Sequence, residues 1–205
     1  MEILKKIIFI ALVIFAGNSF SQNEDKLLEA FTKSYQYEQE GEYSEAINVL
    51  KEVYSEESYE INLRLGWLHY MSGLFTESSP YYQKSIDLKP ISVEARLGIV
   101  YPLAALGNWS QVENVYNEII NLDPENSTAN YKLGLIYYGK GDYKTASKYF
   151  ELLLNHYPFD YDSIIMSAWT YYYLGEMRKA KILFYKALLN TPNDKSALEG
   201  LSLIQ

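Results

Sequence analysis

The chain contains no cysteine among its 205 residues. Disulfide bonds, thiol catalysis and thiolate metal sites are therefore all excluded, and so is a lipid-modified N-terminal cysteine. This absence does not identify a compartment, because exported proteins without disulfides are common.

Residues that build catalytic and metal sites are also scarce. The two histidines, His69 and His156, lack the spacing of a metal-binding helix. No glycine-rich phosphate loop follows a predicted strand, and no nucleophile is accompanied by a base and an orienting partner. The carboxylates are scattered, as in residues 56–57 and 123–125, which is typical of solvated loops. We therefore expect no enzyme activity, no metal site and no cofactor.

Long apolar segments are missing as well. The apolar run at residues 7–17 has 11 residues, whereas a membrane-spanning helix needs about 20. Lys5 and Lys6 precede this run, and Ser19 and Ser21 provide small residues at −3 and −1 before Gln22, as in a cleavable secretory signal. We predict export to the periplasm or extracellular space, cleavage after Ser21 and no stable membrane span thereafter. An uncleaved anchor is the alternative.

Basic residues are outnumbered by acidic ones, 18 to 26, which gives a formal net charge of −8. Removal of residues 1–21 leaves 16 basic and 25 acidic residues, a net charge of −9. An acidic chain is a poor candidate for binding nucleic acid or anionic lipid. We expect a protein or peptide partner and no nucleic acid, and the oligomeric state remains open.

Glycine and proline number only 11 and 6, but most of them keep a common period. Each glycine of a series that begins at Gly73 is taken as position 15 of a 34-residue repeat. Four repeats then cover residues 59–92, 93–126, 127–160 and 161–194, and a slightly shorter repeat covers 27–58 around Gly41. Two residue types with one period indicate a repeat architecture. The two series, each spaced by 34 residues, are Gly73, Gly107, Gly141 and Gly175, and Pro90, Pro124, Pro158 and Pro192.

Each repeat has the pattern of a helix, a turn and a second helix. Apolar residues recur at helical spacing on both sides of the glycine. The glycine is suited to a left-handed residue after the first helix, and the proline ends the second. One repeat cannot bury its apolar face alone, so neighbouring repeats must stack. We predict an all-α fold of five repeats over 27–194, a short flexible segment at 22–26 and a capping helix at 195–205.

Repeat 127–160 has the fullest set of recurring residues: Leu133-Gly134, Tyr137, Gly141, Tyr143, Ala146, Phe150 and Pro158. This set resembles the tetratricopeptide repeat, and the resemblance extends over residues 27–194. It implies a right-handed α-solenoid. It also implies small residues at positions 8 and 20, where paired helices approach, and large residues at positions 24 and 28, between repeats.

Repeat 93–126 departs from this pattern. Val100, Val112 and Ile119 replace small residues, and Pro102 lies inside the first helix. Because an interior proline removes a hydrogen bond and kinks a helix, we predict a bend near Pro102 and a wider helix pair. Gly98, two positions early, is predicted to leave a notch for a ligand.

The resemblance also implies a concave groove lined by the first helices, at positions 2, 5, 9, 12 and 13. Position 5 borders the core and is expected to pack helix against helix. Positions 9 and 12 are mostly aromatic, and position 6 adds positive charge that could meet a peptide carboxylate. The predicted groove residues are Tyr35, Arg64, Trp67, Tyr70, Tyr101, Tyr131, Lys132, Tyr138, Trp169 and Tyr172.

We interpret the chain as a non-catalytic scaffold that binds a protein or peptide in this aromatic groove, in the cell envelope or elsewhere outside the cytoplasm. A glycan- or cell-wall-binding module is one alternative, because aromatic rings also stack on sugars. A structural or assembly subunit that uses its outer faces is another, since the fold alone does not select a function.

Overall fold

The structure, a computed structural model, describes residues 24–204. The predicted export signal and its cleavage site lie outside the described residues. Helix already covers residues 24–26, which the sequence analysis assigned to a flexible segment. Lys26 and its neighbours Leu27 and Leu28 are good helix formers, so the chain is already helical three residues before the first repeat.

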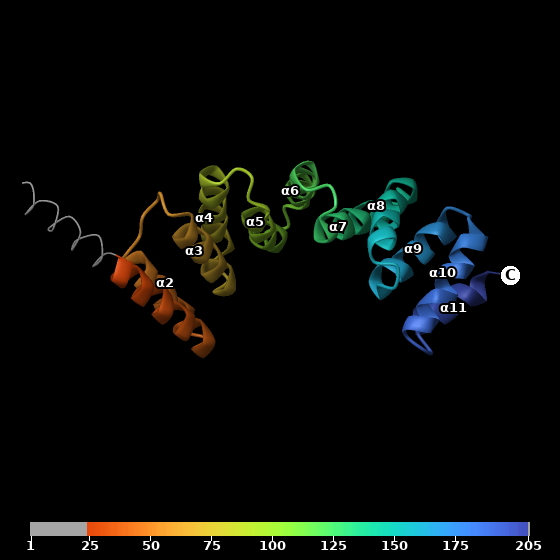
Figure 1. Cartoon of the computed structure of the whole chain (residues 1–205), viewed down its shortest axis with the longest axis horizontal. Coiled ribbons are helices and arrows are strands. Elements are labelled where there is room, and N and C mark those ends of the chain that lie inside the picture. The colour runs from red at the N-terminus through yellow and green to blue at the C-terminus, as the bar shows by residue number, and fades with distance from the viewer. Residues whose placement is uncertain (1–23, 205) are drawn as a thin grey trace, which may run out of the picture. The chain divides into compact units, whose positions relative to one another are not determined.

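All regular elements of residues 24–204 are helices (Figure 1). An N-terminal helix covers 24–40 in its described part. It is followed by α2 (Tyr43–Lys51), α3 (Tyr59–Met71), α4 (Phe75–Leu88), α5 (Val93–Ala105), α6 (Trp109–Leu122), α7 (Ser127–Gly139), α8 (Tyr143–His156), α9 (Tyr161–Tyr173), α10 (Met177–Asn190) and α11 (Lys195–Leu203). The predicted all-α solenoid of helix–turn–helix repeats with a C-terminal helix is confirmed.

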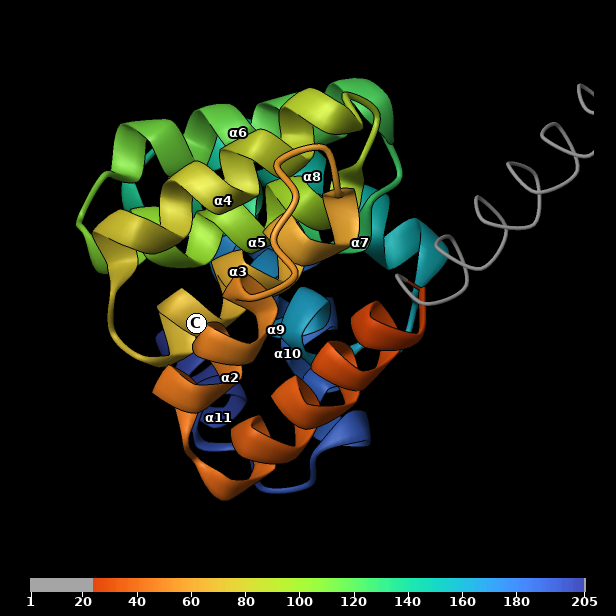
Figure 2. The ribbon, with the colours of Figure 1, turned by 90° about the vertical axis from the view of Figure 1, so that its left-hand side faces the viewer.

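The chain forms two compact units, which divide between Gly107 and Asn108. In the first unit α3, α4 and α5 pack side by side, with α2 against α3 (Figures 1 and 2). In the second, each of the helices from α6 to α11 packs against the next. The division falls inside repeat 93–126, whose packing positions depart from the pattern. Helix α5 continues through the buried Pro102 without interruption.

The ends of the first helices are specified by two periodic features. The glycine after each of these helices has φ between 75° and 80°, as predicted: Gly41, Gly73, Gly107, Gly141 and Gly175. The residue before each first helix from α3 onward is a side-chain cap, whose oxygen accepts a backbone N–H from the third helical residue. These caps are Ser58, Ser92, Asn126, Asp160 and Asp194. They keep the 34-residue period that the glycines and prolines show.

A buried side chain at position 24 of each repeat connects neighbouring helices. In the first unit this residue is Tyr82, which is 3% exposed. A Cβ added to Gly98 would lie 2.2 Å from its ring, and one added to Gly66 would lie 2.9 Å from it. Phe184 faces Gly200 in the same way, at 2.1 Å. The Tyr82 ring thus occupies the space on the side of Gly98 where a Cβ would lie. Gly98 itself still lines a hollow of the first unit, where the sequence predicted a notch.

Replacement of Gly98 by alanine tests this contact. The new methyl group must displace Tyr82 or α5, so we expect Gly98→Ala to destabilise the protein by about 1–3 kcal/mol. Gly139→Ala is the matched control, because nothing lies within 4 Å of the added Cβ and alanine favours helix. Thermal or denaturant unfolding measures both. Equal stability of the two variants would contradict close packing at Gly98.

His69 is a buried titratable group in the core of the first unit, 3% exposed. Its Nδ1–H group donates to the Leu65 carbonyl at 2.7 Å, and its ring packs on Tyr81 with centroids 4.8 Å apart. Burial lowers the pKa of His69 below its ordinary value of 6.5; nearby Lys51 also lowers it, and Glu77 opposes the shift.

A pH dependence of stability follows from this lowered pKa. The folded state favours the neutral imidazole. The contribution of His69 to the free energy of unfolding is therefore fully present above pH 6.5 and declines as the pH falls below that value. We expect the unfolding midpoint to drop between pH 7 and about pH 5. His69→Gln should flatten this slope, whereas His156→Gln, at the other histidine, should not. The measurement is urea unfolding at a series of pH values.

Candidate functional site

A hollow of the first unit lies along the N-terminal helix, α3 and α5, with a volume of about 770 Å³. Its walls are mainly apolar and aromatic. They include four predicted groove residues, at positions 6 and 9 of their repeats: Tyr35, Arg64, Trp67 and Tyr101. Position 5, which the sequence analysis assigned to helix packing, also lines it through Phe31, Leu63 and Leu97.

Arg64, which α3 places in this groove, is 7% exposed and has several partners. Its Nη1 lies 2.6 Å from Oε2 of Glu38, and its Nη2 donates to the Ser34 carbonyl at 3.2 Å. The guanidinium also lies over the ring of Tyr35, with its carbon 3.8 Å from the centroid. Its charge is neutralised within the protein. This differs from the expectation from the sequence, in which Arg64 was to meet a ligand carboxylate.

Glu38 connects this ion pair to the aromatic wall. While one carboxylate oxygen binds Arg64, the other accepts a hydrogen bond from the indole N–H of Trp67. Both oxygens are thus engaged, and Trp67 is held by its polar edge. Glu38 occupies position 12 of repeat 27–58, and its role was not predicted from the sequence because its partners Arg64 and Trp67 lie about one repeat away.

Three aromatic rings form a cluster at the groove: Trp67 and Tyr101 line it, whereas Tyr70, also a predicted groove residue, packs against both and is not among the lining residues. Trp67 lies with its centroid 5.8 Å from Tyr70 and 6.2 Å from Tyr101, and the two tyrosine rings are 5.3 Å apart. Tyr101 is 50% exposed, so one ring of the cluster is open to solvent. Aromatic rings in such positions provide contact area for an apolar ligand and a face for a cation.

Two carboxylates at position 2 line the same groove, Glu60 and Glu94. Glu60 pairs with Lys89, with Nζ and Oε1 3.2 Å apart. Glu94 accepts a hydrogen bond from the hydroxyl of Tyr59 at 3.0 Å. Among residues 24–204 no lysine, arginine or histidine forms an ion pair with it. Both residues occupy position 2, which the resemblance assigns to the groove, so the sequence could have identified them. Only the structure shows which of the two has no cation partner among residues 24–204.

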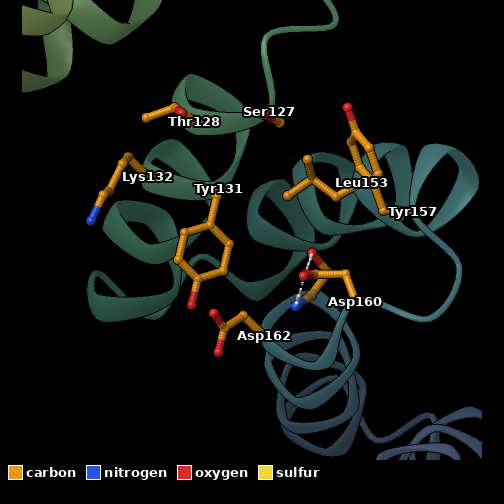
Figure 3. Close-up of a pocket in the computed structure, with 9 residues that line it drawn as sticks. Ser127, Thr128, Tyr131, Lys132, Leu153, Tyr157, Asp160 and Asp162 are labelled. Atoms are coloured by element: carbon orange, nitrogen blue, oxygen red, sulfur yellow. Dashed lines mark hydrogen bonds between the residues drawn. The ribbon is translucent and has the colours of Figure 1, made fainter. Parts of the chain in front are cut away.

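Two predicted residues, Tyr131 and Lys132, line a separate pocket of about 390 Å³ in the second unit (Figure 3). In this pocket Tyr131 directs its hydroxyl toward Asp162 (Figure 3). Burial raises the pKa of Tyr131, and the charges of Asp162 and Asp160 add to the shift. Asp160 is engaged as the cap of α9 through Ser163. Lys132 is exposed.

The other three predicted residues of the second unit belong to an aromatic cluster around Tyr173. This ring stacks on Tyr143 at 4.7 Å and lies 5.9 Å from Tyr138. Trp169 and Tyr172 pack against it, and the indole N–H of Trp169 donates to Ser196 Oγ at 2.7 Å. Burial raises the pKa of Tyr138 to about 12, with Tyr173 and Tyr143 contributing. These rings mainly contact one another.

Nowhere within residues 24–204 do three histidine or carboxylate side chains gather as a metal site would require. No helix in this range combines the length and apolar character needed to cross a membrane.

The ion pair between Arg64 and Glu38 is expected to stabilise the first unit. Glu38→Gln removes the negative charge and leaves a buried guanidinium without its counterion, at a cost of about 1–3 kcal/mol. Glu60→Gln removes a carboxylate from an exposed pair and should change stability by less than about 0.5 kcal/mol. Denaturant unfolding followed by tryptophan fluorescence compares them. A Glu38→Gln variant as stable as wild type would contradict the role assigned to this pair.

Comparison with known proteins agrees with the repeat register. A family model described as the tetratricopeptide repeat matches residues 128–160. A tetratricopeptide repeat protein from Parabacteroides merdae has a similar structure, with a TM-score of 0.74 and 20% identity over 88% of this chain and 72% of that one. MamA from Desulfovibrio magneticus has a TM-score of 0.69, with 17% identity over 83% of this chain and 98% of the other. Another MamA structure gives 0.70, with 21% identity over 82% and 92%.

These similarities concern the fold, because all three identities are below 25%. They agree with the five-repeat register read from the glycines and prolines and with the helices observed in residues 24–204. The family model covers one repeat of the chain. Residues 24–204 therefore have the fold of tetratricopeptide repeat proteins, a solenoid of helix–turn–helix repeats that fits five repeats and a C-terminal helix.

Proposed function

We propose that the protein is an interaction scaffold in which the groove of the first unit binds an extended segment of a partner protein. Repeat solenoids expose long continuous surfaces and are typically non-catalytic interaction modules. A groove of about 770 Å³ is within the usual range of ligand sites. Its length along three successive first helices suits a short extended peptide. The proposed setting is outside the cytoplasm, on the basis of the export signal predicted at residues 1–21.

The charge of the groove determines which segment it prefers. Arg64 is neutralised by Glu38, and Glu60 is paired with Lys89. Glu94 is the groove carboxylate for which the described residues supply no cation. A ligand that places a lysine or arginine near Glu94 gains an ion pair and a ring face at Tyr101. We infer that the preferred segment is apolar with one basic side chain. Glu94 is the observation on which this preference depends.

A glycan ligand receives less support from the second unit. Sugar stacking requires free ring faces, whereas Tyr143 and Tyr173 lie face to face, with an interplanar angle of 11°. The rings of Trp169 and Tyr172 pack in the same cluster. We therefore favour a protein partner at the groove of the first unit.

This preference is tested with end-blocked synthetic peptides that share one apolar sequence and carry lysine, glutamine or glutamate at a single position. Wild-type protein should bind the lysine peptide more tightly than the glutamine peptide, and the glutamate peptide least. Glu94→Gln should reduce the lysine preference about tenfold, or about 1.4 kcal/mol. Fluorescence anisotropy measures each affinity. Equal binding of the lysine and glutamate peptides would show that the charge assignment is wrong.

The aromatic wall is tested with a matched pair of variants. Tyr101→Ala removes a ring of the groove that is 50% exposed, and Tyr157→Ala removes a ring of the second unit that is 51% exposed. Only the first should weaken peptide binding and reduce capture of partners from a native envelope extract. If wild type binds no peptide and Tyr101→Ala still captures the same partners, the groove is not the binding site.

A further inference from the structure

The outward face of α10 carries an exposed apolar stripe. Ile182, Tyr185 and Leu189 are spaced by three and four residues, which places them on one side of the helix. They are 58%, 54% and 76% exposed. Arg178, Lys181 and Lys186 flank this stripe on the exposed side of the helix, and none of the three forms an ion pair within residues 24–204. Helix α10 contains no carboxylate.

In α4, α6 and α8 the same three positions are polar with one exception, Pro80, so the packing of the solenoid does not require large apolar residues there. The equivalent residues, 34, 68 and 102 positions earlier, are Lys148, Glu151 and Asn155 in α8, Asn114, Asn117 and Asn121 in α6, and Pro80, Gln83 and Asp87 in α4. Exposed apolar side chains grouped on one face of a soluble protein mark an interaction surface. The last complete repeat therefore differs from the rest by this surface.

The complementary chemistry is present at the other end of the same chain. Residues 24–60 contain eleven carboxylates and three lysines, a formal charge of −8, whereas residues 161–205 contain four carboxylates and five basic residues, a charge of +1. On the N-terminal helix, Leu28 is 69% exposed and lies beside Glu24 and Asp25. The nearby Glu29 is paired with Lys33, and Lys26 lies two residues before Leu28. Glu24 and Asp25, one turn before Leu28, are the carboxylates that this helix offers to the basic α10 face.

We propose that α10 of one copy docks on the N-terminal helix of a second copy, in a head-to-tail contact. Ile182 and Leu189 would cover Leu28, while the basic residues of α10 would lie near Glu24 and Asp25. The contact joins two different faces and is heterologous, so each copy keeps one free end. A contact between two single helices is smaller than a standard stable interface. The association is therefore weak and salt-dependent.

Sedimentation velocity of residues 22–205, which contain every described helix, tests the contact over a range of protein and salt concentrations. We expect reversible association that weakens as salt rises. Leu189→Glu should raise the dissociation constant at least about tenfold. Asn155→Glu introduces the same charge at the equivalent position of α8, and it should leave association unchanged.

A charge exchange identifies the partner face. Lys181→Glu with Lys186→Glu should abolish self-association, and so should Glu24→Lys with Asp25→Lys. A mixture of the two double variants should associate again, because one supplies an acidic α10 and the other a basic N-terminal helix. Wild-type protein that stays monomeric at every concentration, or a mixture that does not recover, would overturn the proposal. Leu189-dependent binding to anionic vesicles by a monomeric protein would assign the α10 face to lipid instead.

Discussion

The structure depends above all on one packing contact, repeated within each unit: a large side chain at position 24 fills the space between the first helix of its own repeat and the first helix of the next. Tyr82 occupies this position in the first unit and Phe150 and Phe184 in the second, and all three are buried. Small residues face the rings, as Gly66 and Gly98 face Tyr82. In a solenoid each repeat is stabilised only by its neighbours, so this contact determines how closely successive first helices approach and where their exposed sides can form a groove.

Burial also determines the electrostatics of that groove. Arg64 is held among Ser34, Tyr35 and Glu38, because a buried guanidinium requires a counterion and hydrogen-bond acceptors. Once it is neutralised, the remaining charge near the ligand site comes from carboxylates at position 2, above all Glu94. The preference proposed for a basic apolar segment thus follows from the packing of α3 on the N-terminal helix.

Much of the fold was predictable because it depends on backbone requirements that recur every 34 residues. A left-handed residue after each first helix requires glycine, and the prolines end the second helices. The serine, asparagine and aspartate caps keep the same period, although the sequence analysis did not use them. The candidate site was only partly predictable. Periodicity brought Tyr35, Trp67 and Tyr101 to one face and placed Gly98 beside the groove, but it assigned Leu63 and Leu97, which also line the groove, to packing.

The sequence by itself determined the repeat, the helix boundaries and the face on which each aromatic residue lies, since these follow from local dihedral preferences and helical spacing. The tertiary structure decided which side chains meet. Of the ten predicted residues, four line the groove of the first unit, Tyr70 packs beside that groove, and five lie in the pocket and cluster of the second unit. The structure also paired Arg64 with Glu38, whereas no cation of residues 24–204 pairs with Glu94. These outcomes depend on contacts between residues about 30 positions apart. The identities of these residues differ from repeat to repeat, so the 34-residue period does not reveal them.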